Sequence, residues 1–393
     1  MTRFSSIFSQ LLQLFPRSEF EQAVEKHQAE RSAKGFTSWG QFVAMLFCQL
    51  GRAHSLREIC GGLASCEGKL KHLGVAEAPK KSTLAYANEH RPWELYQTVF
   101  EQLLEKCQSV VAAAGCKKPF RFKNKLVSLD SSTIDLCMAL FDWAKFRRTK
   151  GAVKLHLLLD HDGYLPSYAV ITDGKKSDIK VARTMKFAPG TVLVVDRGYN
   201  DYDWFAELTD QGAFFVTRMK DNAVYEVVEK RDIPDKGHVR RDEVIFFPSM
   251  AIEGKEYFFR RVEVWDEDQQ RTLVFLTNHL KFGSTTIAAI YKDRWKVELF
   301  FKAIKQNLKI KTFLGTSANA VHTQIWIALI AILVLKYLQL KSTFGWSLSN
   351  LVALLRLQLF VYRDLYTWLN APFEAPPNLE GIHDAQLVLN LAR

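Results

Sequence analysis

A short apolar run from Thr191 to Val195, followed by Asp196, restricts the possible fold more than any other segment of the chain. Because this run has no polar face, it predicts a strand buried on both sides, as in the parallel sheets of α/β proteins. A second strand of this kind is expected over Leu126–Leu129, and it is followed by Asp130. Each of the two aspartates therefore stands at the predicted end of a buried strand.

The elements around these two strands predict an α/β fold. Strands expected at 154–160 and 168–172 are joined by the turn His161-Asp162-Gly163. A helix near 178–185, a second helix at 202–210 and a strand at 213–217 complete the pattern. Three antiparallel strands, a helix and then β-α-β is the order of a ribonuclease-H-like domain, in which the fourth strand lies parallel beside the first. This order places Asp130 and Asp196 at the same edge of the sheet.

Changes in pattern along the chain divide it into regions. The predicted regions are a helical N-terminal DNA-binding domain (1–115), the first part of a ribonuclease-H-like catalytic core (120–222), an inserted β-strand subdomain (223–280), the second part of the core (281–320) and a helical C-terminal region (321–393). Lys117-Lys118-Pro119 is the expected linker between the first two regions.

Two short helices in the N-terminal region fit a helix-turn-helix. Ser55 and Glu58 form a capping box that opens the first helix, and the segment from Lys80-Lys81 to Arg91 carries the second. The paired lysines and Arg91 are candidate contacts to DNA phosphates. An ordinary helical bundle with solvated lysines explains the same pattern equally well.

Charge and hydropathy narrow the class of partner. The chain has 53 Lys and Arg against 42 Asp and Glu, a net charge of +11, which favours a polyanion, with nucleic acid first and an anionic membrane second. The most apolar run, Ile325–Leu335, is too short to span a bilayer and predicts a buried core helix instead. No signal peptide is expected. The six cysteines contain no CxxC pair, which argues against a zinc ribbon and favours the reducing cytoplasm.

A long helix predicted over 285–311, with Ser284 as its cap, brings four functional side chains to one face. Tyr291, Arg294, Glu298 and Lys305 fall within about one sixth of the helix circumference. An apolar stripe lies beside them, made of Ile290, Val297, Phe301, Ile304 and Leu308. Such a row suits a site for phosphate and metal, although a surface helix with ion pairs gives a similar pattern.

Asp130, Asp196 and Glu298 can be read in two ways. Two carboxylates at one sheet edge repel each other unless a cation lies between them, and hard oxygen ligands select Mg²⁺ or Mn²⁺. Taken singly, an aspartate after a strand is more often a cap or turn residue. Eight Lys and Arg against two acids between Lys281 and Lys311 favour a DNA-backbone track along the same helix.

The spacing Tyr291-x2-Arg294-x3-Glu298-x6-Lys305 resembles the signature of DDE transposases of the insertion-sequence-4 type. The blocks around Asp196 and Asp130 are similar to the second and first catalytic blocks of that family, and read VVDRGYND and LVSLDSST. The N-terminal segments look like the helical domain of a bacterial subgroup, and include GFTSWGQFVAMLFCQL, SLREI and KKSTLAYANEHRPWELY. The resemblance covers nearly the whole chain.

The resemblance implies a function and a set of roles. Asp130, Asp196 and Glu298 would hold two Mg²⁺ ions, with Mn²⁺ as a substitute, for DNA cleavage and strand transfer. Tyr291, Arg294 and Lys305 would contact the phosphates of the cleaved end. The partners would be terminal inverted repeats and target DNA, bound by a homodimer in a paired-end complex.

Further readings stay open. Some relatives flip a base onto an aromatic side chain of the inserted domain, a role that Trp265 or Tyr257 could take here, although an aromatic in a strand is more often core. His156 is expected to be a hydrogen-bonded core histidine rather than a catalytic one. A nuclease of the same fold that cuts without joining, or a catalytically idle DNA-binding derivative, are the alternatives to an active transposase.

Overall fold

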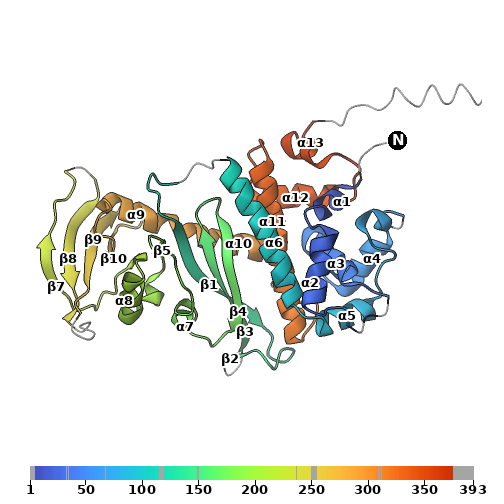
Figure 1. The fold of residues 1–393 in the computed structure, drawn as a ribbon, viewed down its shortest axis with the longest axis horizontal. Coiled ribbons are helices and arrows are strands. Elements are labelled where there is room, and N and C mark those ends of the chain that lie inside the picture. Colours follow the sequence, from blue (N-terminus) through green and yellow to red (C-terminus); the bar gives the residue numbers. More distant parts are fainter. Residues whose placement is uncertain are drawn as a thin grey trace, which may run out of the picture.

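The computed structural model describes residues 5–31, 33, 35–66, 68–114, 119–147, 150–235, 237–248, 255–308, 310 and 312–374. It is an elongated α/β protein with a body of helices at one end and a large sheet at the other (Figure 1). Lys117 and Lys118 of the predicted linker, the predicted helix end at Lys311 and the chain beyond residue 374 lie outside the described residues.

The helical body combines both ends of the chain. Its N-terminal helices are α1 (Ile7–Leu12), α2 (Arg17–Lys26), α3 (Ser38–Gly51), α4 (Leu56–Ala64), the short 3₁₀ turn η1 (Leu70–Leu73), α5 (Lys81–His90) and α6 (Glu94–Ala114). Its C-terminal helices are α11 (Ala318–Lys341), α12 (Leu348–Gln358) and α13 (Leu365–Asn370). The two regions that the sequence separates therefore share one hydrophobic core.

Helix α11 is the centre of this body and packs against α3, α5 and α6. Within the described part of the chain it is the one helix long and apolar enough to cross a membrane, but 83% of its most apolar stretch is buried by protein. The predicted core helix at Ile325–Leu335 is confirmed, since every residue of that run is at most 2% exposed. Its apolar surface is used up by packing against other helices.

The predicted capping box is present: the Ser55 hydroxyl accepts from the Glu58 N–H at 3.1 Å, and the Glu58 carboxylate accepts from the His54 N–H. Helices α4 and α5 contact each other, so the predicted helix pair is confirmed. The connection between them spans residues 65–80 and contains η1. It is longer than the three or four residues of a standard helix-turn-helix.

The strands that the structure describes form one sheet. Their bounds are β1 (Leu126–Leu136), β2 (Lys145–Arg147), β3 (Lys150–Asp160), β4 (Leu165–Asp173), β5 (Val192–Val194), β6 (Phe214–Arg218), β7 (Glu226–Lys230), β8 (Val239–Phe246), β9 (Phe258–Asp266) and β10 (Arg271–Thr277). The order is β2-β3-β1-β5-β6-β10-β9-β8-β7, with β4 paired to β3. The strands of the predicted insertion thus extend the core sheet through β10, which pairs with β6.

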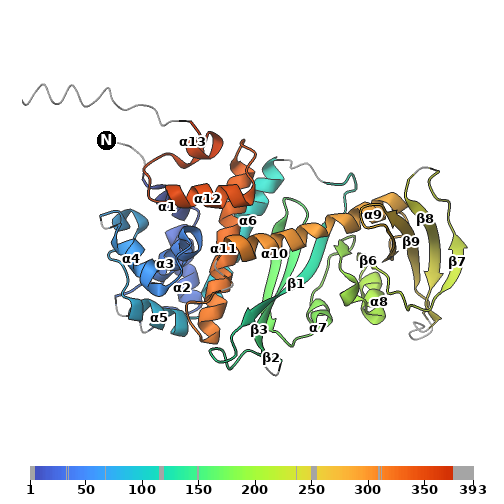
Figure 2. The ribbon, with the colours of Figure 1, turned by 180° about the vertical axis from the view of Figure 1, so that it is seen from behind.

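Helices cover both faces of the sheet. On one face lie α7 (Asp178–Ala182), the 3₁₀ turn η2 (Arg197–Tyr199) and α8 (Tyr202–Asp210). On the other, α9 (Ser284–Asp293) and α10 (Trp295–Asn307) run one after the other toward the helical body (Figure 2). The alternating side chains of β5 divide between the two cores: Leu193 packs with the α8 side and Val192 and Val194 with the α9 side. This confirms the prediction of a strand buried on both faces.

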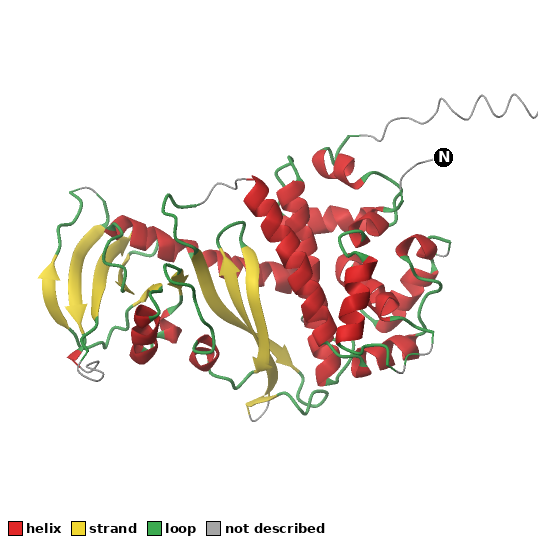
Figure 3. Cartoon of the chain, in the orientation of Figure 1, coloured by secondary structure: helices red, strands yellow, loops and turns green. Residues whose placement is uncertain are grey.

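The strands are gathered in one half of the molecule, where helices pack against them, and the other half consists of helices and their connecting loops (Figure 3). Helix α10 spans the junction, since it contacts β1 as well as α11 and α12. The apolar stripe predicted for this segment is buried throughout, from Ile290 at 0% exposure to Phe301 at 6%. The polar face of the same helix is thereby fixed against the sheet edge.

Candidate active site

Asp130 lies on β1, and Asp196 lies level with it, two residues past the end of the neighbouring strand β5. Strands β1 and β5 pair in parallel, with Leu126 opposite Val192 and Ser128 opposite Val194, so the register brings residue 130 to the level of residue 196. The predicted adjacency is confirmed. The prediction that Asp130 ends its strand is wrong, because β1 continues to Leu136 and is held there by antiparallel pairing with β3.

Asp196 begins the 3₁₀ turn η2 and its carboxylate accepts from the Gly198 N–H at 2.6 Å. A Cβ atom at Gly198 would lie 2.8 Å from the Asp196 carboxylate oxygen, closer than side chains approach. A side chain at residue 198 would therefore have to displace the Asp196 carboxylate, so the glycine in the block VVDRGYND leaves room for it.

The predicted long helix is interrupted at Arg294. Gly283 rather than Ser284 is the cap of α9, so the predicted cap is also wrong. At the break the Arg294 N–H donates to the Tyr291 carbonyl and the Val297 N–H donates to the Arg294 carbonyl. These are bonds over three residues, so one tightened turn joins α9 to α10.

This turn aims Arg294 between two acids. Its guanidinium donates to Glu298 at 2.5 Å and lies 3.6 Å from the Asp130 carboxylate. Only 11% of the Arg294 side chain is exposed, and its guanidinium carbon lies 5.4 Å from the centre of the Tyr291 ring. Tyr291, Arg294 and Glu298, brought together by the predicted helical spacing, thus meet the aspartate of β1 in space.

Lys305 completes the row at the other end of α10. Its ammonium donates to the Thr133 carbonyl of β1 at 3.0 Å. A hollow lies between β1 and α10, lined by Asp130, Ser131, Ser132, Glu298, Phe301, Lys302, Lys305 and Gln306. The α10 wall carries Glu298 and the two lysines, Lys302 and Lys305, and the β1 wall carries Asp130. This mixture of acids and cations suits a phosphate backbone held beside a cation.

The three acids are close enough for their charges to act on one another. Burial raises the pKa of Asp130 to about 6, and the charges of Asp196 and Glu298 act in the same direction. The Ser131 N–H and the Arg294 guanidinium oppose that shift. Repulsion among three carboxylates is the condition that a divalent cation relieves, and their oxygens are the hard ligands that Mg²⁺ prefers.

Among the described residues, no three His, Cys, Asp or Glu side chains already stand close enough together to hold a metal ion. Arg294 supplies the positive charge between Asp130 and Glu298 instead. The donor set thus fits a divalent cation in its chemistry, while the side chains are arranged around a guanidinium.

The other predicted site residues lie elsewhere. Lys80 and Lys81 are exposed at the start of α5, in the helical body (Figure 1). Arg91 is 9% exposed, and its guanidinium donates to the Gln41 side chain and to the Phe36 carbonyl. The prediction that Arg91 contacts DNA is corrected, because its guanidinium is buried in the helical body and donates its hydrogen bonds there.

The two candidate aromatics differ in accessibility. Tyr257 is buried and its hydroxyl donates to Asp210 at 2.7 Å, so it is a core residue. Trp265 is half-buried on β9. Arg218 pairs with Phe275, and Phe275 pairs with Val262, so Val262 is the residue of β9 that lies level with Asp196. Trp265 lies three residues further along β9 than this position.

His156 is a core histidine. It is 1% exposed, its Nε2 atom shares a hydrogen bond with Thr172, and burial lowers its pKa to about 4. Sequence reasoning missed three residues near the acids. Lys302 lines the hollow, and the charge of Arg218 acts on Tyr291. The Asp178 carboxylate accepts from the hydroxyl of Ser131, the neighbour of Asp130. Arg218 directly follows a predicted strand, in the same position relative to its strand as Asp196, and this was the available signal.

Comparison with known proteins bears on this site. The family described as "Transposase DDE domain" matches residues 121–334, more than half of the chain, and a domain of unknown function, DUF4372, matches residues 3–76. A protein of Sinorhizobium fredii named as a transposase is 31% identical over 331 residues, which cover 83% of this chain and 89% of that protein. A protein of Geobacillus stearothermophilus, named as a transposase for an insertion sequence element, is 28% identical over 68% of this chain and 70% of that protein.

Among solved structures, a piggyBac transposase synaptic complex with hairpin DNA superposes with a TM-score of 0.44 at 10% identity, over 96% of this chain and 84% of that one.

Proposed function

The chain belongs to the DDE transposase family, and from this we propose that Asp130, Asp196 and Glu298 are the three acids of its catalytic centre. It is thus an enzyme that cleaves DNA and transfers strands. The observation that carries the assignment is the contact of Arg294 with both Asp130 and Glu298, which brings strand β1 and helix α10 together beside Asp196. The finer proposal is cut-and-paste transposition of an insertion sequence.

The strand arrangement supports a ribonuclease-H-like core. β1 pairs antiparallel with β3 and parallel with β5, and β5 pairs parallel with β6. This is the order expected from the sequence, with one acid on β1 and the other just past the end of the adjacent strand β5. The edge where they meet is the place at which ligands bind in open α/β sheets.

Enzymes of this family typically use a divalent metal, and we assign two Mg²⁺ ions, with Mn²⁺ as a substitute, to the three carboxylates. When bound, the metal would polarise the scissile phosphate and lower the pKa of the attacking hydroxyl. The chain's own residues have separate tasks. Asp130, Asp196 and Glu298 supply the oxygen ligands, and the burial of Asp130 keeps bulk water from weakening the interaction.

The cations on α9 and α10 orient the DNA. The Arg294 guanidinium can redirect an N–H from Glu298 to a phosphate oxygen, since carboxylates and phosphates are both charged acceptors that its planar fork of N–H groups can bind. Tyr291 lies beside it, and Lys302 and Lys305 line the hollow next to Asp130. Together these side chains hold the backbone of a DNA end in line with the acids, which is the positioning that phosphoryl transfer needs.

The wider proposal covers the partners. Transposases act on DNA, and we assign terminal inverted repeats and target DNA to this chain, bound by a homodimer in a paired-end complex in the cytoplasm. Lys80 and Lys81 at the exposed start of α5 are the proposed contacts of the helical body, and Trp265 is the proposed platform for a flipped base.

The test is strand cleavage and joining on a duplex copied from the two ends of the encoding element, with Mg²⁺. Wild type should cut and join, and Glu298→Gln should cut on the order of 10²–10³-fold more slowly while binding the duplex equally well. The matched control is Glu207→Gln on α8, a glutamate that is also paired with an arginine, Arg183 at 3.1 Å. Equal cutting by wild type and Glu298→Gln refutes the assignment, and cutting without joining favours a nuclease.

A further inference from the structure

A chain of hydrogen bonds lies beneath the proposed centre. The Ser128 hydroxyl and the His161 Nε2 atom are 2.7 Å apart, and His161 Nδ1 lies 2.5 Å from an Asp293 carboxylate oxygen. Because an ionised carboxylate only accepts, the proton between His161 and Asp293 is donated by Nδ1. The chain joins strand β1, the β3–β4 turn and the last residue of α9.

The order Ser-His-Asp is that of a hydrolase triad, but burial rules that role out here. Ser128 is 0% exposed and His161 is 1% exposed. A nucleophilic serine needs its oxygen to reach a substrate carbonyl, which a fully enclosed hydroxyl cannot do. The three groups must act on the protein around them.

The turn that carries His161 is held in a constrained form. Gly163 has φ +78°, and a Cβ atom there would lie 2.7 Å from Val111 of α6. Tyr164 has φ 51°, a left-handed conformation that is costly for a bulky side chain. Its hydroxyl donates to the two oxygens of Asp293 at 3.2 and 3.1 Å. A strained residue that persists in this way indicates that its side chain is needed where it lies.

The two end members of this hydrogen-bond chain, Ser128 and Asp293, lie next to the proposed catalytic residues. Ser128 and Asp130 are two residues apart on β1 and so lie on the same face of the strand. Asp293 directly precedes Arg294, at the tightened turn between α9 and α10. Whatever fixes Asp293 against Ser128 therefore fixes Arg294 and Glu298 against Asp130.

We propose that Ser128, His161, Tyr164 and Asp293 form a positioning network that sets the α9–α10 turn against β1, so that Arg294 and Glu298 face Asp130. The inference rests on the proposed function. The carboxylate of Asp293 collects bonds from an imidazole and a phenol that come from one rigid turn. It is thus held from two directions, and the helix break cannot slide along the strand.

The test compares Asp293→Asn with wild type in the cleavage assay on the duplex copied from the ends of the element. A displacement near 1 Å costs about a hundredfold in rate, so we expect kcat to fall at least tenfold. The dissociation constant for the duplex should stay within threefold of wild type. The matched control is Asp268→Asn: it removes the same charge from an ion pair with Lys292, the neighbour of Asp293, but both side chains are over 80% exposed.

A second variant separates positioning from general destabilisation. Because Arg294 follows Asp293 directly and donates to Glu298, the network acts on both residues through Arg294. Asp293→Asn should therefore cut no more than twofold more slowly in an Arg294→Gln background than Arg294→Gln alone. A full tenfold further loss in that background overturns the proposal, as does cleavage by Asp293→Asn within twofold of wild type. If circular dichroism shows that Asp293→Asn does not fold, Tyr164→Phe and Ser128→Ala replace it under the same criteria.

The two proposals fail in different ways. Loss of cutting in Glu298→Gln with normal cutting in Asp293→Asn leaves the catalytic centre in place and removes the network. Normal cutting in Glu298→Gln removes the centre itself, whatever Asp293→Asn does.

Discussion

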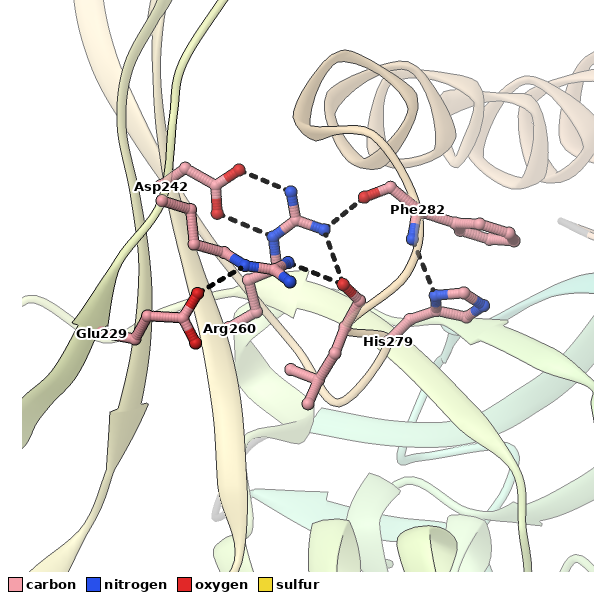
Figure 4. A network of polar contacts seen from close by, with 7 residues as sticks. Glu229, Asp242, Arg260, His279 and Phe282 are labelled. Atoms are coloured by element: carbon pink, nitrogen blue, oxygen red, sulfur yellow. Dashed lines mark hydrogen bonds and ion pairs between the residues drawn. The ribbon is translucent and has the colours of Figure 1, made fainter.

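Arg260 on β9 and Asp242 on β8 form an ion pair inside the sheet, and its removal makes a quantitative prediction. The guanidinium donates to the two Asp242 oxygens at 2.7 and 2.5 Å and also to the carbonyls of Leu280 and Phe282 (Figure 4). The two side chains are 4% and 2% exposed. The pair therefore ties the outer strands to the segment that begins α9.

The magnitude follows from what each substitution leaves behind. Arg260→Met leaves the Asp242 carboxylate buried without a counter-charge, and Asp242→Leu does the same to the guanidinium. Each single change should cost about 3–5 kcal/mol of unfolding free energy. In the double variant neither charge is present, and the Leu280 carbonyl keeps a bond from Arg231 at 2.6 Å. Its stability should lie within about 2 kcal/mol of wild type.

The assay is urea denaturation of wild type, the two single variants and the double variant at pH 7.5. The coupling free energy, which is the double-variant loss minus the sum of the single losses, should be at least about 4 kcal/mol in favour of the double variant. Arg241→Met is the control. Arg241 lies next to Asp242 on β8 and pairs with Glu263 of β9 at 3.3 Å, but its side chain is 63% exposed. It should cost about 0–1 kcal/mol.

The reasoning is refuted if the losses of the two single variants add in the double variant. Additive losses would mean that Arg260 and Asp242 stabilise the protein through separate neighbours. A loss below about 1 kcal/mol for Arg260→Met would mean that the carboxylate finds another partner or a proton.

Three further predictions concern the helical body and the core. Changing Lys80 and Lys81 together to Gln should weaken binding to all DNA sequences and reduce the slope of log affinity against log salt by about 1.8, and an unchanged slope would contradict the proposed contact. Arg91→Met should leave that slope unchanged but lower the unfolding free energy by about 1–3 kcal/mol, because the acceptors on Gln41 and Phe36 lose their donor. Burial lowers the pKa of His156 from 6.5 to about 4, so its imidazole is neutral in the folded protein, and the free energy of unfolding falls as pH drops below 6.5, by about 2 kcal/mol at pH 5. His156→Gln should flatten this pH dependence in denaturation curves. An equally steep dependence in the variant would refute the assignment.

Local signals predicted the elements well where a cap or a strand face decides them. Helix α8 spans Tyr202–Asp210, as predicted, because the Asp201 side chain accepts from the Trp204 N–H and fixes the start. Strand β1 was predicted too short, because its second half from Ser131 is polar. That half is held by pairing with β3, and such a partner cannot be seen in the strand's own residues.

The site was predictable to the extent that one helix carries it. Helical spacing brought Tyr291, Arg294 and Glu298 together, and the structure keeps that arrangement despite the break between α9 and α10. The prediction of a DNA contact for Arg91 was wrong because a sequence does not distinguish an arginine that points outward from one that points inward. The network of Ser128, His161 and Asp293 was out of reach, because it joins three segments that only the fold brings together.

The net charge of +11 and the acidic centre follow from a single requirement. A positive surface attracts DNA, but a site that holds divalent cations needs negative charge, which repels the same phosphates. Arg294 resolves the conflict locally, since its guanidinium offsets the charge of Asp130 and Glu298. When bound by these acids, a divalent cation would offset their charge, and the guanidinium would then be available to a phosphate oxygen of the DNA. Replacing Arg294 with Gln should therefore weaken the binding of a DNA end but lower the Mg²⁺ concentration needed for half-maximal cutting, because no guanidinium then competes with the cation for Asp130 and Glu298. Titrating Mg²⁺ in the cleavage assay separates the two effects, and an unchanged or higher Mg²⁺ requirement would contradict this role.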